Sequence, residues 1–240
     1  MISIYKMDII EHKNNDKKLH ISKIPMTCDD RGNRPDPLPP YNFAMLVVGR
    51  PASGKTNLIV NLVNKKGKFY NKKFNRVLIF SPSLNTLDTE LKLPPEQIFT
   101  DISMSELNEE LKYLKEMLQE DPKYKTLFIF DDMINNFKND IPEFLKTLYN
   151  RRHYGLSVII VSQVYNKLPM QLRKAVSHLI LFKPPKQEIE SVHRDAIHLK
   201  KDDFEKLIKY VYDKKYQFLF IDLNENKYYK NFNKLDLKEK

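Results

Sequence analysis

The sequence of 240 residues predicts an α/β fold of three layers, in which helices cover both faces of a mainly parallel central sheet. Five continuous apolar runs have the length and composition of strands that are buried on both faces. Helix-like stretches separate these runs along the chain. Because strands that alternate with helices are joined by right-handed crossovers, this pattern favours a parallel sheet. The length suits one such domain with short additions.

Residues 1–42 are predicted to form an N-terminal arm and a Pro-rich linker. They are polar, and their last part holds four prolines within six residues, Pro35, Pro37, Pro39 and Pro40. Proline fixes its backbone and lacks an N–H donor, which excludes a helix or an interior strand there. We therefore expect the core to begin at residue 43.

The five apolar runs define the predicted core, residues 43–185. The first run covers residues 43–48 and ends at a glycine. The other four runs are residues 77–80, 127–130, 158–161 and 179–182. The clearest helix covers residues 105–119, where leucines recur at helical spacing among charged residues and an Asp-Pro pair follows.

Residues 186–240 are predicted to form a short C-terminal α+β extension that packs on this core. Its pattern indicates two helices, near residues 188–198 and 203–212. A strand pair follows, around residues 217–222 and 227–230, connected by a polar turn.

The segment directly after the first strand matches the Walker A pattern G-x-x-x-x-G-K-[ST] through Gly49, Gly54, Lys55 and Thr56. A buried strand before it and an amphipathic helix, residues 57–64, after it supply the context that the pattern requires. Glycines let backbone N–H groups approach phosphates, the lysine reaches the β- and γ-phosphates, and the threonine hydroxyl binds Mg²⁺. The sequence therefore predicts a P-loop NTPase that binds ATP and Mg²⁺. The candidate nucleotide-binding residues are Gly49, Arg50, Pro51, Ala52, Ser53, Gly54, Lys55, Thr56 and Asn57.

The run at residues 127–130 ends in two carboxylates, Asp131 and Asp132, which is typical of a Walker B strand. We expect Asp131 to hold Mg²⁺ together with Thr56, directly or through water. Asp132 is then the candidate that orients or deprotonates the attacking water. The alternative is that Asp132 only caps the following segment.

The run at residues 158–161 ends in Ser162 and Gln163. In P-loop proteins that carry an extra strand between the P-loop strand and the Walker B strand, a polar residue at this strand end senses the γ-phosphate. Gln163 is therefore a candidate contact for the γ-phosphate or the attacking water, and the alternative is a loop glutamine without a role.

Arg151 and Arg152 lie a few residues before the same strand, in the segment Arg151-Arg152-His153-Tyr154. An arginine that enters a neighbouring subunit's site can neutralise transition-state charge, as it does in GTPases. The alternative is a solvated helix end, where basic side chains are favoured. Of the two, we slightly favour Arg152 as the finger.

Together these motifs resemble the genome-packaging ATPases of large DNA viruses and virophages, the poxvirus-type branch of the FtsK/HerA translocases. The resemblance spans residues 43–163 and is carried by the Walker motifs, Phe80-Ser81-Pro82-Ser83, the arginine pair and Gln163. It implies a RecA-like, ASCE-type fold and a ring homo-oligomer whose arginine acts in trans. It also implies a motor that drives double-stranded DNA into a preformed capsid and contacts capsid proteins at a portal or vertex. Asp132 departs from the Asp-Glu pair common among translocases.

The net charge of +10 favours a polyanionic partner. The stretch of residues 65–76 holds six cations and three aromatic residues and no acid, a pattern suited to phosphate contacts. An exposed connection is the alternative, and we place it at the sheet edge away from the nucleotide.

A single cysteine and the lack of a long apolar run indicate a protein of a reducing interior without a membrane span. With the resemblance, this predicts a soluble protein of the host-cell cytoplasm or viral factory, or one associated with the virion. Two other functions use the same P-loop: a nucleotide kinase or similar small-substrate phosphotransferase, and a regulatory ATP-binding module without motor activity. A guanine-specificity sequence of the Asn-Lys-x-Asp type does not stand at the end of any of the predicted strands, which favours ATP.

Overall fold

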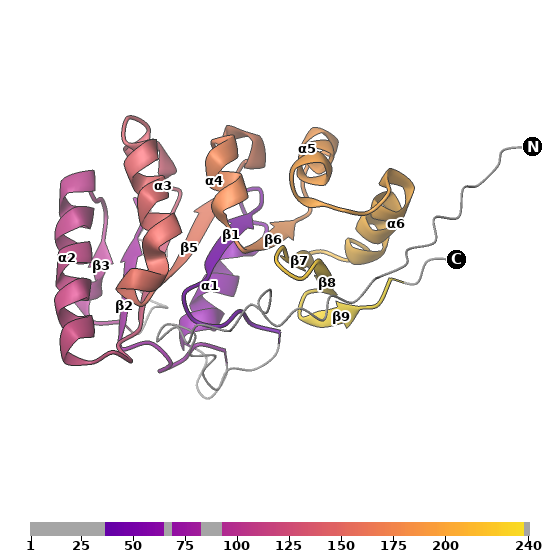
Figure 1. Ribbon diagram of the computed structural model, residues 1–240. Helices are drawn as coiled ribbons and strands as arrows, with labels where there is room; N and C mark the ends of the chain where they lie inside the picture. The colour runs from indigo at the N-terminus through magenta and orange to yellow at the C-terminus, as the bar shows by residue number, and fades with distance from the viewer. Residues whose placement is uncertain (1–36, 65–68, 83–92, 238–240) are drawn as a thin grey trace, which may run out of the picture.

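The computed structural model describes residues 37–64, 69–82 and 93–237 of the chain. These residues form a sheet in the order β3-β2-β4-β5-β1-β6-β7-β8-β9 (Figure 1). The strands are β1 Ala44–Val48, β2 Arg76–Phe80, β3 Ile98–Phe99, β4 Thr126–Asp131, β5 Leu156–Ser162, β6 His178–Phe182, β7 Phe218–Asp222, β8 Lys227–Lys230 and β9 Asn233–Leu235.

The strands from β3 to β6 are parallel, and β1 lies between β5 and β6. Strand β5 also pairs with β4, so it separates the strand before the predicted P-loop from the predicted Walker B strand. The register places Val48 opposite Ser162 and Asp131 opposite Val161. The carboxyl ends of β1, β4 and β5 therefore meet at one edge of the sheet.

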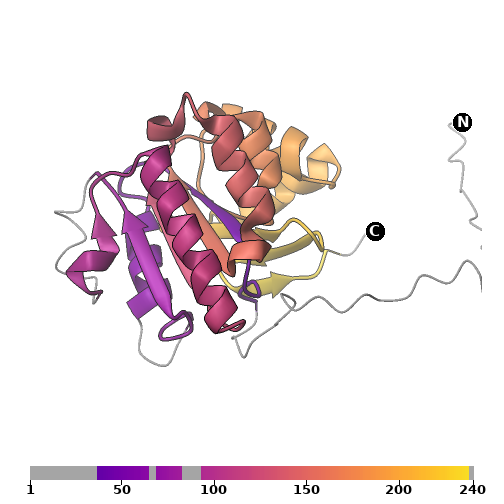
Figure 2. The same cartoon turned by 60° about the vertical axis from the view of Figure 1, so that its left-hand side comes forward.

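The helices cover both faces of the sheet, which confirms the three layers. Figures 1 and 2 show α1 on one face and α2 to α6 side by side on the other. The α-helices are α1 Lys55–Asn64, α2 Met104–Glu120, α3 Ile141–Asn150, α4 Met170–Ala175, α5 Lys186–Ala196 and α6 Lys201–Val211. The short 3₁₀ helices are η3 Pro95–Gln97, η4 Ile134–Phe137, η5 Arg151–Tyr154 and η6 Tyr165–Lys167.

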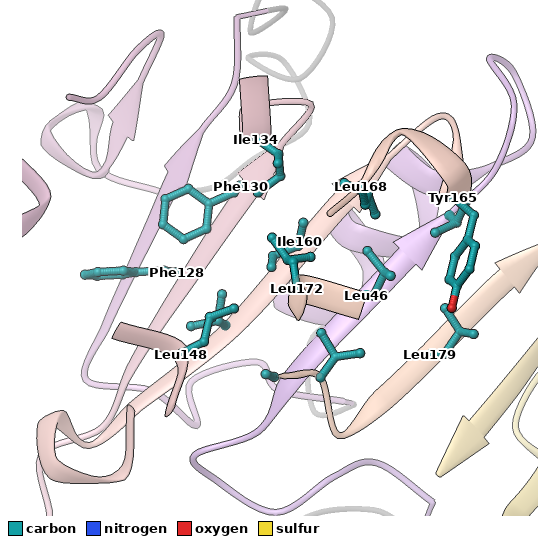
Figure 3. Packing of buried hydrophobic residues seen from close by; sticks show 14 of the residues in the cluster. Leu46, Phe128, Phe130, Ile134, Leu148, Ile160, Tyr165, Leu168, Leu172 and Leu179 are labelled. Carbon is teal, nitrogen blue, oxygen red and sulfur yellow. The ribbon is translucent and has the colours of Figure 1, made fainter. Parts of the chain in front are cut away.

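Two hydrophobic clusters fill the space between these layers. Leu46, Phe128 and Ile160 point to the face of α2–α6 (Figure 3), whereas Met45 and Val47 point to α1. Because successive side chains of a strand point to opposite faces, a strand covered on both sides is apolar at every position. This geometry explains why the core strands are continuous apolar runs.

The C-terminal residues continue the sheet in the antiparallel direction. Strand β7 pairs with β6, and β8 and β9 follow. The two helices and the strand pair expected there are present. The sequence did not predict β9, or β3 at the other edge, because three and two residues are too few to show a periodic pattern. The division of the chain at residue 185 stays a prediction.

Residues 37–42 of the predicted linker pack on the core rather than leave it. Leu38 is buried, and the Tyr70 hydroxyl donates a hydrogen bond to the Pro39 carbonyl at 2.9 Å. The backbone N–H of Asn42 donates to the Ser157 hydroxyl at 2.9 Å. The rest of the arm, residues 1–36, lies outside the described residues. Across the part of the chain that the structure describes, none of the helices is long and apolar enough to cross a membrane.

Candidate active site

Residues 49–54 form a tight loop between β1 and α1. The Gly49 N–H donates to the Ser162 carbonyl at 3.1 Å, which ties the loop to β5. A Cβ atom at Gly49 would lie 2.7 Å from the Phe182 Cβ and 2.6 Å from the Ser53 Oγ, so only glycine fits between β1 and β6. Ala52 and Gly54 have φ angles of 59° and 104°, in the left-handed region that favours glycine.

Helix α1 begins at Lys55, and its first helical hydrogen bond runs from the Leu58 N–H to the Gly54 carbonyl at 3.0 Å. The N–H groups of the first turn, at Lys55, Thr56 and Asn57, precede that bond and have no acceptor within the helix. A helix N-terminus after a left-handed loop presents such groups to an anion. This edge of the sheet is therefore built to hold phosphate.

Lys55 is buried and faces inward. Its Nζ donates to the Gly49 carbonyl at 2.6 Å and to the Arg50 carbonyl at 3.1 Å. Burial lowers the pKa of Lys55, and the negative charges of Asp132 and Asp131 oppose that shift. The ammonium thus lies within the electrostatic reach of both Walker B carboxylates, in the place where the motif requires a phosphate ligand.

Asp131 ends β4, and the Ser81 hydroxyl donates to its Oδ2 at 3.0 Å. Burial raises the pKa of Asp131. The hydrogen bond from Ser81 is the largest effect that opposes this rise. The carboxylate and the hydroxyl of Thr56, at the start of α1, are hard oxygen donors of the kind that Mg²⁺ prefers. Sequence reasoning did not single out Ser81 as a site residue, although it follows the apolar run of β2 as Ser162 follows that of β5.

Asp132 and Gln163 contact each other directly. The Gln163 Nε2 donates to the Asp132 Oδ2 at 2.7 Å, across 31 residues of sequence. Asp132 has a φ of 54°, an uncommon backbone conformation for a residue other than glycine, and its N–H donates to the Val161 carbonyl at 3.0 Å. The capping alternative does not hold for the next helix, because η4 has Met133 at its N-cap and no side-chain cap bond.

Arg151 and Arg152 lie in η5, before the amino end of β5, so they stand at the edge of the sheet opposite Gln163. Arg151 forms hydrogen bonds within its own chain. Its Nε donates to the Asn42 carbonyl and its Nη1 to the Leu148 carbonyl, both at 2.7 Å. Burial lowers the pKa of Arg151, with a further contribution from Arg152. Arg152 is exposed. This geometry favours Arg152 over Arg151 as a residue that reaches another molecule.

The basic stretch of residues 65–76 differs from the expectation. Residues 65–68 lie outside the described residues, and the aromatic side chains of the remainder pack inward. Tyr70 is buried, and Phe69 and Phe74 pack against the same cluster. Arg76 forms a bidentate pair with Glu110, with distances of 2.7 and 3.3 Å, which leaves the exposed Lys72 and Lys73.

The placement of that connection away from the nucleotide is also wrong in part. The Tyr70 N–H donates to the Leu62 carbonyl, so the chain turns back along α1 after residue 68. Phe69 thereby lines the cavity beside the P-loop. The structure thus brings the P-loop, Asp131, Asp132 and Gln163 to one edge of the sheet, and it keeps the arginine pair apart from them.

Comparisons with known proteins give one family match and several solved structures of similar fold. A family model described as "Poxvirus A32 protein" matches residues 34–231. The genome packaging NTPase B204 from Sulfolobus turreted icosahedral virus 2, in complex with sulfate, is similar with a TM-score of 0.59 and 19% identity, over 81% of this chain and 98% of that chain. The same protein in complex with ATP-gammaS gives 0.56 and 18%, over 81% and 98%.

B204 from Sulfolobus turreted icosahedral virus, described as the DNA-packaging ATPase, gives a TM-score of 0.58 at 16% identity, over 80% of this chain and 98% of that chain. A search of curated protein sequences found no match. At these identities the likeness concerns the fold, and it confirms a P-loop NTPase fold with a mostly parallel sheet and antiparallel C-terminal strands.

Proposed function

This chain belongs to the poxvirus A32 protein family, and on that premise we propose that it is a genome-packaging ATPase. It hydrolyses ATP and uses the energy to drive double-stranded viral DNA into a preformed capsid. The observation that carries the proposal is the edge of the sheet where the charges of Asp131 and of Asp132, which is hydrogen-bonded to Gln163, act on Lys55 at the start of α1. B204, a protein of the same fold, is described as a DNA-packaging ATPase.

The residues at this edge have different roles in hydrolysis. The N–H groups of the loop and Lys55 bind the phosphates, and Thr56 and Asp131 hold Mg²⁺. When bound, Mg²⁺ neutralises charge that develops on the phosphate oxygens. Asp132 orients or deprotonates the attacking water. Gln163 contacts the γ-phosphate or that water, and its hydrogen bond to Asp132 links the two residues.

Arg152 acts in trans, in the site of a neighbouring subunit of a ring. The seven residues of β5 separate Arg152 from Gln163, and at a rise of about 3.3 Å per residue this is roughly 20 Å. An arginine side chain cannot cover that distance, so Arg152 cannot serve the site of its own chain. A ring of identical subunits places it at the site of the next copy.

The partners follow from the same proposal. Double-stranded DNA is the substrate that is moved, and the net charge of +10 favours its polyanionic backbone. The motor binds capsid proteins at a portal or vertex. The protein then works in the host-cell cytoplasm or viral factory, or remains associated with the virion.

Hydrolysis measurements test this proposal. We expect the wild-type protein to hydrolyse ATP with Mg²⁺, duplex DNA to stimulate the rate, and the stimulation to vanish at high salt. The Lys55→Ala variant should lose turnover altogether. A mass measurement of the same sample gives its oligomeric state. Near-normal hydrolysis by Lys55→Ala, or a verified oligomer that ignores duplex DNA, would contradict the proposal.

A further inference from the structure

A cavity lies beside the P-loop on the side away from Asp131 and Gln163. It has a volume of about 600 Å³, within the range of small-ligand sites. Gly54, Thr56 and Asn57 form one wall. The lining also includes four aromatic residues, Phe69, Phe182, Tyr216 and Phe218, which together are called the aromatic wall. The cavity therefore joins a phosphate-binding loop to a set of aromatic faces.

The aromatic wall comes from three parts of the chain. Phe69 lies in the connection after α1, Phe182 ends β6, and Phe218 begins β7. Phe182 and Phe218 are paired across the antiparallel ladder, and their ring centroids are 5.3 Å apart. The C-terminal residues thus contribute directly to the surroundings of the P-loop.

Two of these aromatic residues have an unusual backbone conformation. Tyr216 has a φ of 63° and Phe69 a φ of 51°, although bulky side chains seldom occupy the left-handed region. Conformations of this kind persist where the surrounding structure enforces them, and they cluster at ligand sites. Tyr216 is also 69% exposed, so burial in the hydrophobic core does not explain its position.

The turn that carries Tyr216 is held from both sides. The Tyr212 hydroxyl donates to the Leu181 carbonyl of β6 at 2.7 Å. Lys230 of β8 donates to the Asp213 carboxylate at 2.8 Å and to the Tyr210 carbonyl at 3.1 Å. The Tyr216 ring lies beside the P-loop, with its Cδ1 3.6 Å from the point where a Cβ atom of Gly54 would stand.

We infer that this cavity holds the nucleoside of the bound nucleotide and that the ring of Tyr216 stacks on its base. The inference rests on the proposed function, since it requires the P-loop to hold the phosphates. The phosphates at the first turn of α1 direct the nucleoside to the aromatic wall, because the opposite direction leads to Asp131 and Gln163. Every base has a π face that an aromatic ring can contact. Residues of the C-terminal extension therefore complete the nucleotide site.

Calorimetric titrations with ATP and with inorganic tripolyphosphate, both with Mg²⁺, test this inference. Tyr216→Gly removes the ring and suits the left-handed backbone, so the thermal stability of the variant should not fall. We expect it to bind ATP roughly tenfold or more weakly than the wild type does, as in the loss of one aromatic–base stack. Its affinity for tripolyphosphate should be unchanged, and Tyr216→Phe should bind ATP nearly as the wild type does.

Tyr149→Ala is the matched control, because Tyr149 is a 59% exposed tyrosine of α3 on the other face of the sheet. It should leave both affinities unchanged. ATP binding by Tyr216→Gly at wild-type affinity would overturn the inference while leaving the P-loop assignment intact. If the wild type binds neither ATP nor tripolyphosphate, the proposed function is overturned, and this inference with it.

Lys230 supplies a second test as a positioning residue for Tyr216. Lys230→Ala should weaken ATP binding several-fold when Tyr216 is present. In the Tyr216→Gly background the same change should add nothing, since the ring that it positions is gone. Equal effects in both backgrounds would show that Lys230 acts on the fold and not through Tyr216.

Discussion

The hydrogen bond from Ser81 to Asp131 gives the sharpest prediction about the metal site. Ser81 is fully buried, and its hydroxyl donates to Asp131 Oδ2 at 3.0 Å. It is the largest of the effects that oppose the rise in the pKa of Asp131 caused by burial. Ser81→Ala should therefore raise the pKa of Asp131 further and weaken the binding of Mg²⁺ to its carboxylate.

The expected magnitude follows from the charge on the acceptor. A hydrogen bond to a charged group contributes about 1.5–3 kcal/mol. Loss of a residue that orients a metal ligand reduces metal affinity by roughly 10–100-fold, which is the same range when expressed as a free energy. Because protonation of Asp131 competes with Mg²⁺, the defect should be larger at acidic pH and smaller at alkaline pH.

The assay is the rate of ATP hydrolysis at saturating ATP as a function of Mg²⁺ concentration, at two pH values. Ser81→Ala should require more Mg²⁺ for half-maximal rate and should recover most of its rate at high Mg²⁺. Ser157→Ala is the control: Ser157 is equally buried and accepts a hydrogen bond from the Asn42 N–H, but it lies near the amino end of β5. It should leave the Mg²⁺ requirement unchanged.

A wild-type Mg²⁺ requirement in Ser81→Ala would refute this reasoning. It would mean that Asp131 does not hold the metal, or that its ionisation does not depend on the Ser81 hydroxyl. A loss of rate that no concentration of Mg²⁺ restores, with a matching loss in Ser157→Ala, would indicate damage to the fold and would equally contradict the predicted specific effect.

Three further predictions concern the neighbouring residues. Gln163→Ala should lower the turnover number on the order of 10²-fold with little change in ATP affinity; a large loss of binding in calorimetry would contradict this role. Arg152→Ala and Asp131→Asn should each be inactive alone, and an equal mixture should recover about a quarter of the wild-type rate if the arginine acts in trans; a mixture without activity would exclude it. Because burial raises the pKa of Asp131, its carboxyl ionises less readily in the folded state than in the unfolded state. The free energy of unfolding therefore falls as pH rises from the ordinary pKa of aspartate to the raised pKa. Asp131→Asn should thus melt at a higher temperature than the wild type near pH 7, with the gap closing at pH values below the ordinary range of aspartate, and a pH-independent gap would contradict this cause.

The core strands could be predicted because each is covered on both faces. Val77–Phe80 and Leu127–Phe130 are apolar at every position, and only a strand covered on both sides requires that pattern. The Walker A loop was predictable for a related reason, since Gly49 has no room for a Cβ atom and Gly54 has a positive φ. Where a physical constraint acts on one short segment, the sequence displays it.

Contacts between distant segments could not be predicted in this way. The sequence placed Gln163 and Asp132 at strand ends, but their direct hydrogen bond depends on β5 lying beside β4. The order of strands is set by packing of the whole sheet. The different surroundings of Arg151 and Arg152 likewise became visible only in the structure, where Arg151 donates to the Asn42 carbonyl and Arg152 is exposed.

The aromatic residues after α1 illustrate the same limit. Phe69, Tyr70 and Phe74 stand among cations, a pattern that also suits a nucleic-acid surface. In the folded chain they pack against α1 and beside the P-loop. Tyr216 gave no signal at all, because a single tyrosine in a polar turn has no periodicity, and its contact with Gly54 joins segments that are far apart in the sequence.

Displacement of a third strand from triplex DNA tests the central claim most directly, since a motor that moves along duplex DNA strips off the bound oligonucleotide. With ATP and Mg²⁺, the oligomeric wild-type protein should displace the third strand, and Lys55→Ala, in which the phosphate-binding ammonium is absent, should not. The account predicts that displacement rises with the rate of hydrolysis across the variants described above. ATP hydrolysis by a verified oligomer without any displacement would contradict it.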